Sequence, residues 1–111
     1  MSKTAEKSGA EKSRVTLTMA TVVAAKEEAI STDLDGEVII LNTAKGVYFG
    51  LDTVGTFIWS SLQKPTRLSA VRDMVLQEYA VDAATCETDL LNLVQNLHSQ
   101  SLVDVDESST I

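Results

Sequence analysis

The stretch DGEVIILNTAKGVYFGLDTVGTFIW, residues 35–59, decides how this chain folds. It predicts two β-strands, at 37–42 and 47–51, that run directly into a helix. Gly46 can take the positive φ that the short loop between the strands requires. Asp52 is a typical helix N-cap, so we expect strand to become helix within one residue. Side chains of the second strand point alternately to its two faces, as in a strand with one buried face. One face carries Val47, Phe49 and Leu51, and the other carries Tyr48 and Gly50.

A third strand, at 29–34, precedes this stretch. Asp35-Gly36 follows it, and an Asp-Gly pair between strands favours a type I′ turn. The strand at 37–42 is therefore the middle of a three-stranded antiparallel meander. It is apolar on both faces, which predicts that helices cover one face and that an N-terminal segment covers the other. That segment is 15–25, where apolar and Thr residues alternate, and we expect a strand or an extended cover there.

Three helices are expected after the meander, at about 53–63, 67–79 and 83–100. Each has apolar residues at helical spacing. Thr66 and Asp82 are expected to cap the second and third. The predicted fold class is thus α+β, a winged-helix-like domain with a three-stranded meander followed by three helices. We expect residues 1–14 to be a disordered tail, 15–103 a single domain and 104–111 a frayed C-terminus. The apolar helix positions are Val54, Phe57, Ile58 and Leu62, then Leu68, Val71, Val75 and Tyr79, then Cys86, Leu90, Leu93, Val94 and Leu97.

Charge narrows the choice of partners. The 111 residues carry a net charge of −7, and four of the nine basic residues fall within the first fourteen positions. An acidic body repels phosphate, so nucleic acid and anionic lipid are poor partners and a basic peptide is a better one. No apolar run is long enough for a membrane span or a secretion signal. The single cysteine fits a reducing cytoplasm.

Features of an enzyme are missing from the sequence. It has no glycine-rich phosphate loop and no nucleophile beside a base. One His and one Cys cannot supply the roughly four ligands of a structural zinc site. Cys86 and His98 are too far apart along one helix to form a dyad. We therefore expect no catalysis, no metal and no cofactor.

The strand at 47–51 carries neither charge nor proline, the usual protections of an edge strand. We therefore expect its outer edge to accept a strand from another chain. Roughly four or five backbone hydrogen bonds, at about 0.5–1.5 kcal/mol each, barely offset an association cost of about 4 kcal/mol or more. Side-chain pockets must supply the surplus and the sequence preference.

We predict these pockets between the strand and one side of the third helix. Leu91 lies about 100° from Leu90 on a helical wheel, outside the core stripe. Glu87 and Asp89 would meet Lys or Arg of a bound peptide, although both also suit the first half of a helix. Ordinary packing on the face of the sheet remains an alternative for Tyr48, Phe49 and Leu51, and Leu91 could be an ordinary surface leucine. The full candidate set is Val47, Tyr48, Phe49, Gly50, Leu51, Glu87, Asp89, Leu90, Leu91, Val94, Gln95 and His98.

Two segments also carry a resemblance to a known family. DLDGEVIILNTAKGVYFGLDTVGTFIWSSL (33–62) contains "LDGE", an aliphatic strand, "G-x-Y-[YF]-x-L" and "G-x-x-I-W-x-x-L", and EYAVDAATCETDLLNLVQNL (78–97) contains "E-Y-x-V" and "C-E-x-D". In this order they resemble the PqqD-like family over about residues 29–103. Members recognise leader peptides of ribosomally made, post-translationally modified peptides.

The resemblance implies that the leader lies as an extra strand beside the third strand, in a groove closed by the third helix. The chain is most similar to the stand-alone leader-binding proteins of lasso-peptide clusters. The implied partners are the precursor peptide, a leader-cleaving cysteine protease and an ATP-dependent ring-closing enzyme.

Two other functions remain open from the sequence. A winged helix that binds DNA needs basic residues on its recognition helix. Residues 83–103 contain no Lys or Arg, although Asn92, Gln95 and Asn96 could contact bases. An oligomerisation module that pairs its own edge strands is the second alternative.

Overall fold

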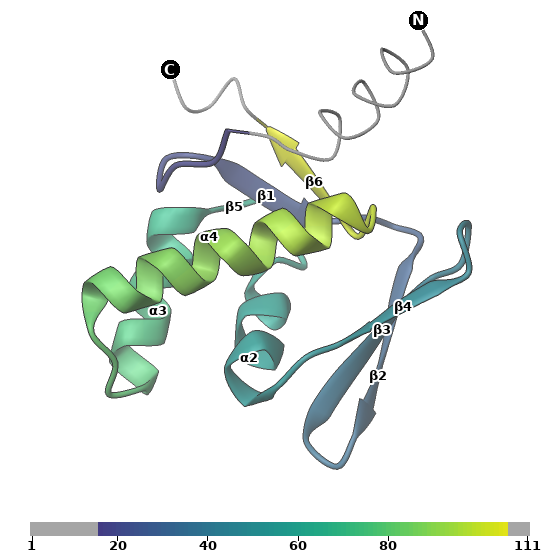
Figure 1. Ribbon diagram of the computed structural model, residues 1–111, viewed down its shortest axis with the longest axis horizontal. Helices are drawn as coiled ribbons and strands as arrows, with labels where there is room; N and C mark the ends of the chain where they lie inside the picture. Colours follow the sequence, from purple (N-terminus) through teal and green to yellow (C-terminus); the bar gives the residue numbers. More distant parts are fainter. Residues whose placement is uncertain (1–15, 107–111) are drawn as a thin grey trace, which may run out of the picture.

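The computed structural model describes residues 16–106, which form two three-stranded antiparallel sheets and a group of helices (Figure 1). The α+β class is as predicted. None of the helices in the described residues is long and apolar enough to cross a membrane. The elements, in chain order, are β1 (Val22–Ala25), β2 (Ala29–Leu34), β3 (Glu37–Asn42), β4 (Val47–Gly50), α2 (Thr53–Ser61), β5 (Thr66–Arg67), α3 (Leu68–Glu78), α4 (Ala83–Ser99) and β6 (Val103–Asp106).

The predicted meander is the sheet β2–β3–β4. Asp35 and Gly36 have φ values of 58° and 85°, the two positive values that a type I′ turn requires. Asp33 tightens this turn, because its carboxylate accepts a hydrogen bond of 2.9 Å from the Gly36 N–H. Gly46, with φ of 70°, takes the positive φ expected in the second loop.

The N-terminal segment contains a strand, β1, as one of the two expectations had it, but β1 does not join or cover the meander, so the expected cover is wrong. Instead β1 lies between β5 and β6 in a second sheet, with Val23 opposite both Thr66 and Val105. The expectation of a frayed end from residue 104 is likewise wrong for 104–106, which belong to β6. Residues 1–15 and 107–111, including the tail expected at 1–14, lie outside the described residues.

The three predicted helices correspond to α2, α3 and α4. The Asp52 carboxylate accepts from the Gly55 N–H at 2.8 Å and the Asp82 carboxylate from the Thr85 N–H at 3.1 Å, so both predicted caps are confirmed. Thr66 is not a cap, because it pairs in β5 and α3 begins after Arg67. The buried core joins both sheets and the helices through Val23, Ile40, Leu51, Ile58, Trp59, Leu62, Leu68, Val71, Val75, Cys86, Leu90, Val94, Leu97, Leu102 and Val103.

Candidate functional site

One edge of β4 is open. Within residues 16–106, β4 pairs with β3 on one side and with no strand on the other. The Leu51 N–H donates to the Val38 oxygen at 2.8 Å, directly opposite in the register of the ladder. Backbone groups of an antiparallel strand alternate in direction, so those of Phe49 also face β3. The N–H and C=O groups of Tyr48 and Gly50 therefore point to the open edge.

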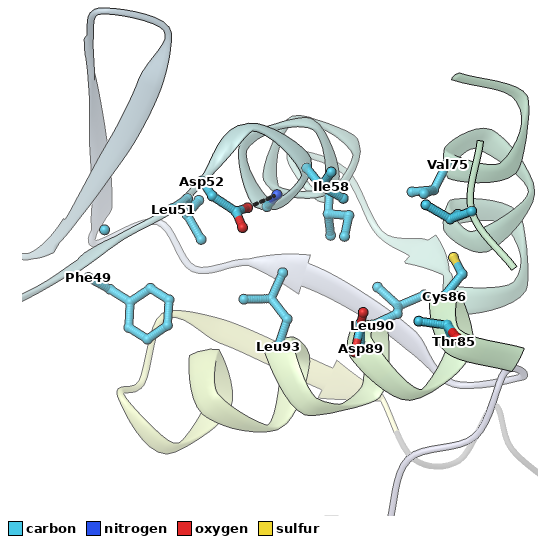
Figure 2. Close-up of a pocket in the computed structure, with 14 residues that line it drawn as sticks. Phe49, Leu51, Asp52, Ile58, Val75, Thr85, Cys86, Asp89, Leu90 and Leu93 are labelled. Atoms are coloured by element: carbon cyan, nitrogen blue, oxygen red, sulfur yellow. Dashed lines mark hydrogen bonds between the residues drawn. The ribbon is translucent and has the colours of Figure 1, made fainter. Parts of the chain in front are cut away.

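A cavity of about 420 Å³ lies beside this edge, between β4, the start of α2 and one flank of α4 (Figure 2). Its walls are mostly apolar. They are formed by Phe49, Gly50, Leu51, Asp52, Val54, Gly55, Ile58, Val75, Val81, Thr85, Cys86, Asp89, Leu90 and Leu93.

The turn from β4 into α2 shapes one wall of the cavity. Gly55 is buried, and a Cβ there would lie 3.2 Å from the Leu51 side chain and 3.1 Å from the Asp52 carboxylate. Those distances are shorter than ordinary van der Waals contact, so glycine permits the first turn of α2 to lie against the end of the strand. Leu51 and Ile58 consequently face the cavity together (Figure 2).

The polar groups of the cavity are few and mainly acidic. Asp89 on α4 is exposed, and Asp52 uses one carboxylate oxygen to cap α2. Cys86 is buried at the other end of the cavity, and burial raises the pKa of its thiol. Nearby charges change this pKa by smaller amounts, some upward and some downward. Within residues 16–106 no group of three or more His, Cys, Asp or Glu side chains could hold a metal ion. The arrangement suits binding of an apolar segment with basic neighbours.

The structure brings only part of the predicted site together. Five predicted residues line the cavity, namely Phe49, Gly50, Leu51, Asp89 and Leu90. Val47 and Tyr48 lie on the same strand outside the cavity, and Val94 is fully buried.

The other four candidates lie on α4 but do not line the cavity: Glu87, Leu91, Gln95 and His98. Glu87 instead accepts a hydrogen bond of 2.7 Å from Arg72 of α3, and this bond is the main cause that raises the pKa of Arg72. Leu91 is half-buried and packs against the core. Of the predicted shoulder of α4, Glu87 therefore contacts α3 and Leu91 packs against the core, whereas Asp89 and Leu93 on the opposite flank line the cavity.

Sequence reasoning missed Leu93, which projects into the cavity from the opposite flank of α4 (Figure 2). On a helical wheel Leu93 lies about 60° from Leu90, on the side away from Leu91. The amphipathic pattern marks both flanks of the stripe. It does not specify which flank faces the strand, because that depends on how the chain crosses the sheet.

The chain is a small α+β domain with an open strand edge beside an apolar cavity, an arrangement that domains use to bind peptides by strand addition. The family model described as "Coenzyme PQQ synthesis protein D (PqqD)" matches residues 37–103. The match spans more than half of the chain, and the chain belongs to the PqqD family.

Two solved structures are similar to about three quarters of the chain. One, described as "TbiB1 in Complex with the TbiA(beta) Leader Peptide", is 36% identical, with a TM-score of 0.68, over 73% of this chain and 94% of that one. The other, "Lasso peptide synthetase B1 complexed with the leader peptide", is 21% identical, with a TM-score of 0.66, over 74% of this chain and 96% of that one. No curated protein matches the chain. The chain is thus homologous to a leader-peptide-binding protein.

Proposed function

We propose that this protein binds the leader segment of a ribosomally made precursor peptide and presents it to modifying enzymes. The observation that carries the proposal is the open edge of β4 beside the apolar cavity. Membership of the PqqD family and the two structural relatives described with leader peptides support it. The leader adds a fourth strand to β2–β3–β4, next to β4.

The open edge sets the backbone part of this binding. Tyr48 and Gly50 each present one N–H and one C=O group, so an added strand forms up to about four hydrogen bonds with β4. At about 1 kcal/mol each, these bonds offset little more than the cost of association. Affinity and sequence preference must therefore come from side chains.

The cavity supplies the side-chain part of leader binding. Successive side chains of an added strand alternate between the two faces of the sheet, so every second leader residue points toward α4. The volume of the cavity, about 420 Å³, falls within the range of pockets that bury drug-sized ligands, roughly 300–1,000 Å³. More than one apolar leader side chain fits against Leu51, Ile58 and Leu93, and each contributes about 1.5–3 kcal/mol on full burial.

Asp89 sets a charge preference at the mouth of the cavity. Its carboxylate is exposed on the cavity side of α4, where it attracts a Lys or Arg next to the apolar leader residues. An exposed pair of this kind contributes about 0.2–1 kcal/mol and is weakened by salt. Asp89→Asn therefore lowers leader affinity by a few fold at low salt, while Glu87→Gln, a matched change on the α3 side, leaves it unchanged.

The proposed role is that of a non-catalytic adaptor in the cytoplasm. Its partners are the precursor peptide and, in a lasso-peptide cluster, a leader-cleaving cysteine protease and an ATP-dependent ring-closing enzyme. Binding of nucleic acid is not favoured, since α4 carries no Lys or Arg between Ala83 and Ser99.

A titration tests the proposal. The probe is a fluorescent synthetic peptide that spans the leader of a lasso precursor from the same genome, with a scrambled peptide of the same composition as control. Saturable binding of the leader alone supports the proposal. Equal binding of both peptides, or binding of neither, contradicts it.

A further inference from the structure

The meander has a second open edge, on β2. In the described part of the chain, β2 pairs with β3 on one side and with no strand on the other. The Val38 oxygen accepts from Leu51, so the backbone groups of its partner in the register, Asp33, point away from β3. Because backbone groups alternate in direction, those of Ser31 point the same way and those of Thr32 point to β3. The outer edge of β2 therefore presents the N–H and C=O groups of Ser31 and Asp33.

Both faces of β2 are bare as well as its edge. The hairpin of β2 and β3 extends away from the helices (Figure 1), and residues 30–34 are all exposed. The exposed fraction is 57% for Ile30 and 55% for Leu34. The strand contains no Pro, Lys or Arg, and Asp33 is its one charged residue. Edge strands usually carry more protection than this against pairing with another strand.

The sequence of β2 is complementary to itself. When two copies of the strand run antiparallel about a twofold axis at Thr32, Ile30 of each copy lies opposite Leu34 of the other. The two Thr32 residues lie opposite each other on the axis. All three are pairs of the non-hydrogen-bonded kind, in which side chains approach most closely. Apolar pairs and Thr–Thr pairs at such positions stabilise a sheet.

The same axis also satisfies the backbone. It places Ser31 of each copy opposite Asp33 of the other, and these are the residues whose backbone groups point outward. Each such pair exchanges two bonds, so about four backbone hydrogen bonds form across the axis. An axis at Asp33 would set two carboxylates opposite each other, and an axis at Ser31 would leave Leu34 without an apolar partner. The axis at Thr32 is therefore favoured.

Charge opposes this pairing only in part. The antiparallel arrangement keeps the acidic turns of the two copies, with Asp35 and Glu37, at opposite ends of the paired strands. Asp33 lies opposite Ser31 rather than opposite a second carboxylate. Two chains of net charge −7 still repel each other, and salt screens this repulsion.

We infer that the protein forms a twofold homodimer in which β2 of one copy pairs with β2 of the other about Thr32. The two meanders then form one continuous sheet, with a β4 strand at each outer edge. A contact of this length buries less surface than the roughly 1,200–2,000 Å² of stable complexes, so the dimer is reversible. Both β4 edges stay open, and each can accept its own leader strand.

Sedimentation velocity over a series of protein concentrations, at low and at moderate salt, measures the dimer. Ser31→Pro removes an outward N–H that the meander does not use, and Ser31→Thr, which keeps that N–H, is the matched control. Circular dichroism checks that both variants fold. We expect the dimer of the wild type to increase with protein concentration and with salt. Ser31→Pro should weaken it at least about tenfold, and Ser31→Thr should change it less than about twofold.

A pair of charge variants tests the register. Ile30→Lys and Leu34→Glu should each weaken the dimer at least about tenfold when alone, because a charge then lies opposite an apolar residue. An equimolar mixture should dimerise again, since one copy of each pairs Lys with Glu on one side of the axis and Leu34 with Ile30 on the other.

Three results overturn the inference. The first is a wild type that stays monomeric at every concentration and at both salts. The second is a folded Ser31→Pro variant that dimerises like the wild type. The third is a mixture of Ile30→Lys and Leu34→Glu that dimerises no better than either variant alone, and this result decides the matter even if Ser31→Pro does not fold.

Discussion

The side-chain amide of Asn42 donates a hydrogen bond of 2.8 Å to the main-chain oxygen of Ser101. Asn42 is the last residue of β3, and Ser101 follows the end of α4, so this bond joins the meander to the helix on the other side of the cavity. Ser101 has φ of 62° and its N–H donates to the His98 oxygen, while the Leu102 N–H donates to the Leu97 oxygen. These are the bonds of a Schellman motif.

Asn42→Ala should lower the free energy of unfolding by about 2–3 kcal/mol. Asn42 is buried, its side-chain oxygen also accepts from the Ala44 and Lys45 N–H groups, and unpaired buried groups cost about 1–3 kcal/mol each. Urea unfolding measures the change. Thr43→Ala, at the exposed neighbouring position, should cost less than about 0.5 kcal/mol. Equal effects of the two variants would show that the Asn42 bonds do not matter.

Proline at two adjacent positions of β4 should have opposite effects. Gly50 directs its N–H to the open edge, so Gly50→Pro should keep the fold within about 1 kcal/mol and weaken leader binding at least tenfold, by loss of a donor and steric clash. Phe49 directs its N–H to β3, so Phe49→Pro should destabilise the domain by about 3 kcal/mol. Circular dichroism and leader titration distinguish the two. Full leader affinity in folded Gly50→Pro would rule out strand addition at this edge.

Leu93→Ala should weaken leader binding about five- to tenfold, while Leu91→Ala should leave the affinity unchanged. Both leucines are half-buried on α4 and pack against the core, but only Leu93 lines the cavity. Both changes should lower the free energy of unfolding by a similar amount, about 1–2 kcal/mol for partly buried leucines. The reverse order of affinities would place the leader on the flank of α4 that contains Leu91.

The thiol of Cys86 should report occupancy of the cavity. Burial raises its pKa, so labelling by a thiol reagent should be slow at neutral pH and accelerate as the pH rises. Saturating leader should slow it further, because Cys86 lines the cavity. The raised pKa also means that stability is full below the ordinary thiol pKa, about 8.5, and falls as the pH rises above it. Cys86→Ala should remove that alkaline loss.

Local chemistry explains why most of the fold could be predicted. Asp35-Gly36, Asp52 and Asp82 act through groups one to three residues away, and the structure confirms the turn and both caps. The alternation in β4 likewise depends on strand geometry alone. The alternation in 15–25 predicted a strand or an extended segment there, but the second sheet could not be predicted, because β1 pairs with β6 across about eighty residues.

The cavity also could be predicted only in part, because local sequence patterns do not encode tertiary packing. Phe49 and Leu51 were predicted from the strand, and Asp89 and Leu90 from the helix. The sequence pattern favours the flank of α4 that contains Leu91, because an apolar residue among polar neighbours is typical of a groove. The burial of Leu91 against the core and the Arg72–Glu87 pair depend on tertiary packing around α4, which no local pattern encodes.

Amide hydrogen exchange at Tyr48 and Gly50 tests the central claim most directly. Both N–H groups point to the open edge, so they should exchange rapidly in the free protein. Saturating leader peptide should slow both by at least tenfold, while the N–H of Leu51, already bonded to Val38, changes little. If the leader binds and the amides of Tyr48 and Gly50 still exchange at their free rates, the peptide does not add a strand to β4.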